Sequence, residues 1–293
     1  MKIMNIIQKI ALLLVFGILI ASCGGGNSKN KINLAYANWA EGIAMTHVAK
    51  VVLEEKGYDV NLMNADIAPI FASLSRGNAD VFMDVWMPVT HHDYMEQYGE
   101  SLEVIGVNYD QARIGLVVPS YVPISSIEEL NEHKDKFKGE IVGIDAGAGI
   151  MKATDAAIPA YELDFNLLTS SGAAMTATLK RAIDNNEWVV VTGWTPHWMF
   201  SRFDIKLLDD PKNVYGDAEQ IQIVTRKGFS EEQPFVAEFL SNVKFTDEQI
   251  SSVMATLEDG NNDLQSAKDW VEANRELINS WLPKEEDSEI LAK

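Results

Sequence analysis

The sequence predicts an α/β protein of two lobes with a ligand cleft between them. Three observations lead to this prediction: strands and helices alternate over residues 31–109, the alternation restarts over 110–218, and mainly helical segments follow over 219–283. Alternating strands and helices form a mostly parallel sheet with helices on its faces. The closing helices have no sheet of their own to cover, and the simplest arrangement returns them to the first unit, completing lobe 1.

The first unit is predicted to contain three strands and two helices in alternation. A β-rich run occupies residues 31–36, and apolar residues at helical spacing predict a helix over 42–56. Gly57 then ends this helix, since glycine is favoured at a left-handed C-terminal position. The other elements are a strand at 59–63, a helix at 67–75 and a strand at 80–86.

The second unit repeats the alternation before the chain returns. A strand at 112–119 begins it, and a glycine-rich turn at 147–149 precedes a helix over 150–161. A strand at 221–225 brings the chain back, and a last helix is expected over 264–281. The chain thus crosses between the lobes twice, which makes a natural hinge around a cleft, and such clefts are preferred ligand sites. The intervening elements are strands at 140–145, 166–168 and 188–192 and a helix at 173–185.

The N-terminal residues indicate an exported protein. A positive start, an apolar run and small residues are typical of a removable secretory signal over residues 1–22. The run is shorter than the roughly 20 residues that span a bilayer. Ile20-Ala-Ser-Cys23 resembles a bacterial lipobox, so we expect Cys23 to carry lipid and to hold the protein at the extracytoplasmic face of the membrane. Residues 23–30 would form a flexible tether, and residues 284–293 an acidic tail.

The composition argues against several partners. The chain has 24 lysines and arginines against 43 aspartates and glutamates, a net charge of −19, and a single cysteine. Nucleic acid requires basic patches, so no nucleic-acid partner is expected. Adjacent His91 and His92 would point in different directions on a helix, so we expect no metal site and no cofactor.

Three segments each place a tryptophan just after a predicted strand. These residues are Trp39, Trp86 and Trp194, each near glycine or proline. Ligands of open α/β sheets bind beyond the carboxyl ends of the strands. Any one tryptophan could be a core residue, but three that converge on one cleft indicate a site. Their faces suit a quaternary ammonium, which donates no N–H hydrogen bond and is cheap to desolvate.

An anion end is predicted at Gly149 and Ile150. Their backbone N–H groups lie between a strand and a helix, where unpaired amides and the helix dipole favour negative charge. The alternative is a tight turn that requires glycine. Together with an aromatic cage that binds a cation, an anion end would make the ligand a zwitterion.

These segments resemble the glycine betaine/proline betaine substrate-binding proteins of ABC importers. The likeness covers residues 31–281, and Thr192-Gly-Trp-Thr-Pro-His-Trp198 is its most specific part. It implies a periplasmic-binding-protein-like fold and osmoprotectant uptake of glycine betaine or a related quaternary-ammonium zwitterion. A permease and an ATPase of the importer would be the protein partners. One departure is Ala146, where relatives often carry proline, and it bears on the rigidity of the loop.

The resemblance also assigns roles to individual residues. The ammonium cage would consist of Trp39, Trp86 and Trp194. The carboxylate of the ligand would be held by the ring of His91 and the amides of Gly149 and Ile150.

Two other classes of protein stay open. A sensory lipoprotein could use the same betaine cleft, and neighbouring genes for a permease and an ATPase would argue against it. A hydrolase acting on a choline-like ester would need a nucleophile with a base. Ser170, Ser171 and His197 could supply such a pair, but no Gly-x-Ser-x-Gly elbow is present, so we expect no enzyme.

Overall fold

The computed structural model describes residues 30–284 of the chain. The expectations for the secretory signal and for Cys23 lie outside these residues, as does the predicted tail from residue 285 onward. Within the described part, no helix is both long and apolar enough to cross a membrane.

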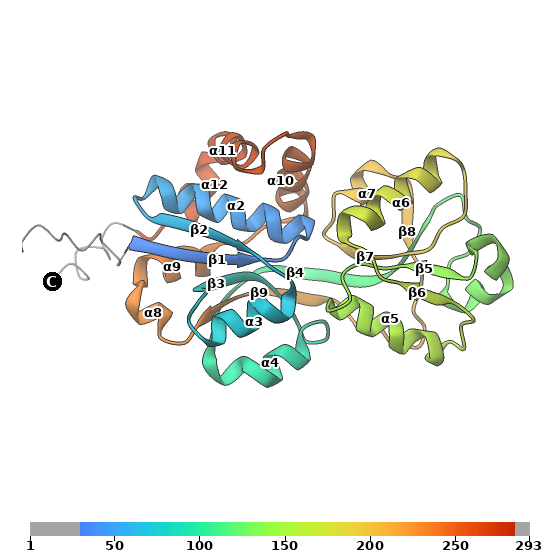
Figure 1. The fold of residues 1–293 in the computed structure, drawn as a ribbon. Helices are drawn as coiled ribbons and strands as arrows, with labels where there is room; N and C mark the ends of the chain where they lie inside the picture. The colour runs from blue at the N-terminus through green and yellow to red at the C-terminus, as the bar shows by residue number, and fades with distance from the viewer. Residues whose placement is uncertain (1–29, 285–293) are drawn as a thin grey trace, which may run out of the picture. The chain divides into compact units, whose positions relative to one another are not determined.

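The first five elements follow the sequence prediction to within two residues, and two short helices that were not predicted come after them (Figure 1). Helix 40–55 is buried on most sides, because it packs on strands of the sheet and is covered by the closing helices. In helix 67–75 the buried residues recur three and four positions apart, as an amphipathic helix requires. The elements are β1 (Lys31–Tyr36), α2 (Ala40–Glu55), β2 (Asp59–Asn64), α3 (Ile67–Ser75), β3 (Val81–Met87), α4 (His92–Tyr98) and the short helix η2 (Gly99–Ser101).

A single long strand, β4 (Leu102–Pro119), joins the two halves of the chain. Its first part pairs with β9 (Glu219–Arg226), and its last part pairs with β7 (Val191–Thr195) and β8 (Ile205–Leu207). Figure 1 shows it running from beside β3 and β9 toward β5 and β7. The sequence prediction placed only residues 112–119 in this strand, because glycine, asparagine and aspartate interrupt its first half.

The described strands form one mixed sheet in the order β2-β1-β3-β9-β4-β7-β5-β6, with β8 paired to β4. The pair β1·β3 is parallel, and so are β5·β6 and β5·β7. The pairs that involve β4 or β9 are antiparallel. The expectation of a mostly parallel sheet therefore holds for the strands outside the crossings and is wrong for the crossings themselves.

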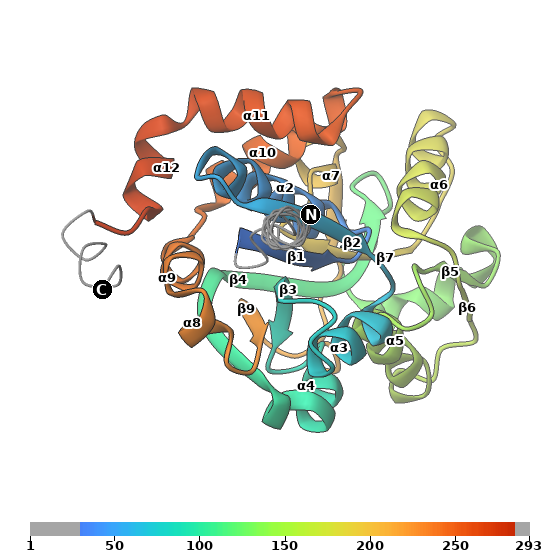
Figure 2. The same cartoon turned by 60° about the vertical axis from the view of Figure 1, so that its left-hand side comes forward.

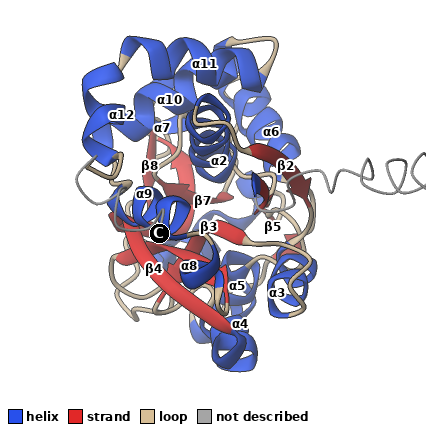
Figure 3. Cartoon of the chain, turned by 90° about the vertical axis from the view of Figure 1, so that its left-hand side faces the viewer, coloured by secondary structure: helices blue, strands red, loops and turns tan. Residues whose placement is uncertain are grey.

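The elements after β4 form the second half of the sheet and its covering helices. Ser126 and Glu129 make a capping box at the start of η3 (Ile127–Phe137). Figure 3 shows helices on both sides of the strands. The remaining elements are β5 (Glu140–Val142), α5 (Gly149–Ala160), β6 (Asn166–Leu168), α6 (Gly172–Asp184) and α7 (Met199–Arg202).

The closing helices pack on the first elements of the chain. Both α10 (Asp247–Asp259) and α11 (Asp263–Ala273) contact α2, and α9 (Pro234–Asn242) contacts β4 (Figure 2). The last predicted helix is in fact two, since the chain breaks at Asn274 between α11 and α12 (Arg275–Trp281). The remaining short helix is α8 (Phe229–Glu232). On this packing we propose that residues 31–109 and 219–283 form lobe 1 and residues 110–218 form lobe 2.

Candidate ligand site

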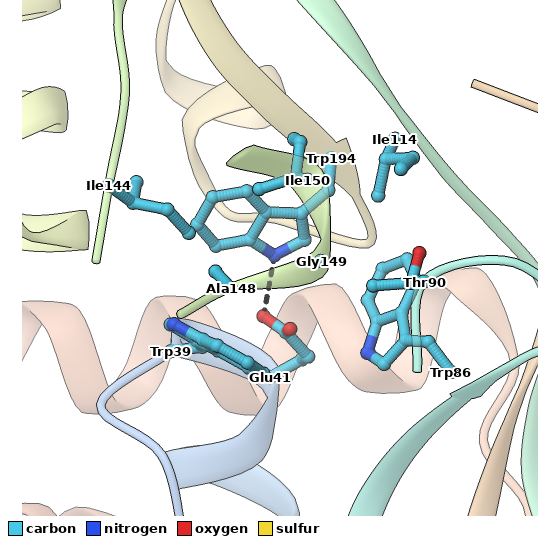
Figure 4. A pocket seen from close by; sticks show the side chains of 10 residues that line it. All are labelled: Trp39, Glu41, Trp86, Thr90, Ile114, Ile144, Ala148, Gly149, Ile150 and Trp194. Atoms are coloured by element: carbon cyan, nitrogen blue, oxygen red, sulfur yellow. Dashed lines mark hydrogen bonds between the residues drawn. The ribbon is translucent and has the colours of Figure 1, made fainter. Parts of the chain in front are cut away.

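One pocket brings together five of the six ligand-binding residues predicted from the sequence (Figure 4). Its empty volume is about 290 Å³, and its walls include Trp39, Trp86 and Trp194 together with Gly149 and Ile150. The three tryptophans therefore converge, although they come from segments far apart in the sequence. The other lining residues are Glu41, Thr90, Ile114, Ile144 and Ala148.

The three tryptophans differ in their position relative to the strands. Trp39 follows β1 as predicted and is the N-cap residue of α2. Trp86 and Trp194 instead lie within β3 and β7, because antiparallel neighbours extend both strands past them: Trp86 pairs with Ile221, and Trp194 with Ile114. The prediction that a tryptophan follows its strand is correct for Trp39 and wrong for Trp194, which lies inside β7. Trp86, the last residue of the predicted strand 80–86, lies inside β3.

Glu41 is a site residue that sequence reasoning missed. Its carboxylate accepts a 2.7 Å hydrogen bond from the indole Nε1–H of Trp194, which lies 153 residues away in the chain. In Figure 4 Glu41 lies between Trp39 and Trp86 and points at the Trp194 indole. The only local signal was an acidic residue in the first turn of a helix, which usually serves the helix dipole.

A second buried carboxylate lies behind the cage. Asp84 accepts a 2.7 Å hydrogen bond from the indole Nε1–H of Trp86, and its other oxygen has no partner among the described residues. Burial raises the pKa of Asp84 to about 7. Burial, followed by the nearby Asp84, also raises the pKa of Glu41 well above its usual value. Hydrogen bonds to these two acids thus fix the orientation of two of the three indoles, and burial favours the neutral form of both acids.

Asp84 should make the stability of the protein depend on pH. Between about pH 4 and pH 7 it is protonated in the folded protein and ionised in the unfolded chain. The resulting stabilisation is complete below pH 4 and is lost as the pH rises through 7. Asparagine cannot titrate, so Asp84→Asn does not lose this stabilisation. The difference in unfolding free energy, Asp84→Asn minus wild type, should therefore rise by up to about 1.4 kcal/mol per pH unit across this window. Urea unfolding from pH 4 to 8 measures this, and parallel curves for the two proteins would contradict it.

His91 lies beside the pocket and does not line it. Its ring is fully buried and stacks on Trp39 with centroids 5.8 Å apart. Its Nδ1 accepts a 2.9 Å hydrogen bond from the backbone N–H of Trp86, and burial lowers its pKa to about 3. The neutral ring must therefore carry its proton on Nε2, which has no partner among the described residues.

The predicted anion end lies at the N-terminus of α5. Gly149 and Ile150 are the first two residues of this helix, where amides have no partner within the helix. Gly149 lies directly against Thr90: a Cβ added to Gly149 would be 2.1 Å from the Thr90 carbonyl oxygen. The glycine is thus required by this close approach and not by an unusual backbone angle.

The residues considered for a hydrolase are engaged elsewhere. The Ser170 hydroxyl donates to the carbonyl of Gly143, and the Ser171 hydroxyl caps α6. His197 packs edge-on against Trp194, and its Nδ1 accepts a hydrogen bond from the amide of Met199. The structure therefore does not bring these groups together as a nucleophile and base.

A two-lobed α/β fold with an aromatic pocket of this kind defines a solute-binding protein. Residues 30–273 match the family described as the substrate-binding domain of the ABC-type glycine betaine transport system. The chain belongs to this family, which confirms the resemblance and the fold class predicted from the sequence. The family serves transport and is not a class of enzymes.

Three relatives illustrate the likeness. The glycine betaine/carnitine transport binding protein GbuC of Listeria monocytogenes is 51% identical over 144 residues, 48% of each chain, so the match spans about half of that relative. Lactococcal OpuAC, solved closed with glycine betaine, is 34% identical with a TM-score of 0.82 over 87% of this chain and all of its own. A choline binding protein solved with choline is 25% identical, with a TM-score of 0.81 over 87% of this chain and 92% of its own.

Proposed function

We propose that this protein is an extracytoplasmic lipoprotein that binds glycine betaine, or a related quaternary-ammonium zwitterion, and delivers it to an ABC permease and its ATPase. The observation that carries the proposal is the single pocket lined by Trp39, Trp86, Trp194 and the N-terminus of α5. Lipid on Cys23 would keep the protein near the permease. The family and the ligands named for its relatives support this proposal.

The two ends of the pocket suit the two charges of the ligand. Three indole faces can each contribute roughly 0.5 to 2 kcal/mol to binding of a trimethylammonium group. The amides of Gly149 and Ile150, which line the pocket, can donate to its carboxylate. The Nε2–H of His91, which has no partner among the described residues, is a further proposed donor although its ring lies beside the pocket. These contacts together can supply the roughly −8 kcal/mol of micromolar binding.

Binding would involve closure of the two lobes around the ligand. Trp39, Trp86 and His91 belong to the proposed lobe 1, and Trp194, Gly149 and Ile150 to lobe 2. Each lobe alone offers an incomplete cage, so ligand bound in the cleft would favour the closed form. Closure excludes water, which strengthens both the cation–π and the anion contacts.

A titration of the purified full-length chain tests the proposal. Tryptophan fluorescence should change with micromolar glycine betaine, and choline should bind at least about tenfold more weakly, because it lacks the carboxylate that the α5 amides would hold. Calorimetry with glycine betaine, proline betaine, carnitine and choline ranks the ligands. Absence of binding to all four would refute the proposed function.

Choline is the second candidate ligand, and the buried acids Glu41 and Asp84 favour it. A cation bound beside Glu41 would shift this acid toward its ionised form, so a Glu41 in the cage wall supports a ligand that carries only positive charge. Equal affinity for choline and glycine betaine would decide against the carboxylate contacts of Gly149, Ile150 and His91.

A further inference from the structure

A third buried carboxylate, Glu219, lies outside the pocket and binds the loop that precedes His91. Its side chain accepts hydrogen bonds from the backbone N–H groups of Val89, at 2.7 Å, and Thr90, at 2.9 Å. It also accepts a hydrogen bond from the Thr90 hydroxyl. Glu219 is 1% exposed, and a buried carboxylate with three donors is held in one position.

The loop that Glu219 holds is part of the ligand site. Thr90 lines the pocket, and its carbonyl packs on Gly149 at the start of α5. The next residue is His91, whose ring stacks on Trp39. A displacement of Thr90 would therefore disturb both the packing on α5 and the placement of the imidazole.

Glu219 is also the first residue of the returning strand. It pairs with Ala112 of β4, so it lies where the two crossing segments run side by side. The preceding turn packs on the same loop: a Cβ added to Gly216 would lie 2.8 Å from Cγ2 of Val89. A change in the path of this strand is thus transmitted directly to residues 89–91.

We propose that Glu219 is a positioning residue that couples the crossing strand β9 to the carboxylate end of the ligand site. In the closed form of the two lobes, the arrangement of the crossing strands lets Glu219 hold Thr90 against Gly149 and His91 beside the α5 amides. It does so through hydrogen bonds and without touching the ligand. The inference rests on the proposed function, because it assigns the anion end of the same pocket.

The test compares two glutamates with the same local chemistry at opposite ends of the β4·β9 pair. Glu103 on β4 likewise accepts from two backbone amides and one hydroxyl, those of Gly228 and Ser230, but lies far along the strand from the pocket residues. Glu219→Gln should raise the dissociation rate of glycine betaine at least about tenfold, the effect of one lost charge-assisted hydrogen bond. Glu103→Gln should leave the rate unchanged. Stopped-flow tryptophan fluorescence on the full-length chain measures both rates, and thermal unfolding measures the stability of each variant.

The outcomes separate this inference from the proposed function. A wild-type dissociation rate in Glu219→Gln, or an equal rise in both variants, overturns the inference while the proposed function stands. If Glu219→Gln does not fold, Thr90→Val, which removes only the hydroxyl, decides instead: an unchanged rate there also overturns it. No fluorescence response of the wild-type chain to glycine betaine refutes the proposed function, and the inference with it.

Discussion

Replacing Trp194 by alanine should weaken glycine betaine binding by about 2 to 4 kcal/mol, roughly 30- to 1,000-fold in the dissociation constant. The change removes one aromatic wall of the pocket. It also removes the indole N–H that Glu41 accepts, and so leaves a buried carboxylate without that partner. Calorimetry with the purified variant measures the affinity, and an unchanged constant would remove Trp194 from the site.

Trp188→Ala is the matched control for this prediction. Trp188 packs against Phe137 and His133, and it does not line the pocket. Its loss should lower the unfolding temperature, because a large side chain is removed from a packed cluster. The dissociation constant should stay within about twofold of wild type, since no proposed ligand contact changes.

Replacing Gly149 by alanine should reduce binding at least about 100-fold, because the close packing of Gly149 on Thr90 leaves no room for a methyl group. The added Cβ would lie 2.1 Å from the carbonyl oxygen of Thr90 and 2.6 Å from its Cγ2. The nearest atom belongs to the backbone of Thr90 and cannot rotate away as a side chain could. The start of α5 must therefore move away from the loop. Alanine itself is favourable in a helix, and the fold should therefore survive.

Gly147→Ala separates this steric effect from loop stiffening. A Cβ on Gly147 would be 3.6 Å from Cγ2 of Ile67, an ordinary contact, and Gly147 does not line the tryptophan pocket. Its affinity for glycine betaine should match wild type by fluorescence titration. A similar loss in both variants would mean that glycine is needed for loop flexibility, and the packing argument would then fail.

Much of the fold could be predicted from local patterns in the sequence. The bounds of β1, α3 and β6 agree with the predicted ranges. In α3 the apolar residues recur at helical spacing and Gly77 follows the helix, which indicates both its type and its end. The first half of β4 could not be predicted from its mixed composition. It is a strand because it pairs with β9, which lies far along the chain. The break at Asn274 likewise interrupts a continuous helical pattern.

The site residues that could be predicted are those whose residue type or local pattern indicates a ligand contact. The residues that were missed are those whose role depends on contacts with distant parts of the chain. Tryptophans near glycine and proline pointed to a pocket, and a glycine-rich turn before a helix pointed to an anion end. Glu41 and Glu219 gave no such signal, because their partners lie 153 and about 130 residues away. A surface acid and a buried, fully partnered acid look alike in a sequence.

The 18 residues of β4 have a consequence for how the chain folds as a whole. One end of this strand is in register with β9 and the other with β7, so a slip by one residue would turn side chains over in both halves at once. A wrong strand register in one half would therefore also destabilise the other half. Because both halves depend on the register of this one strand, we expect them to fold together and not as independent units.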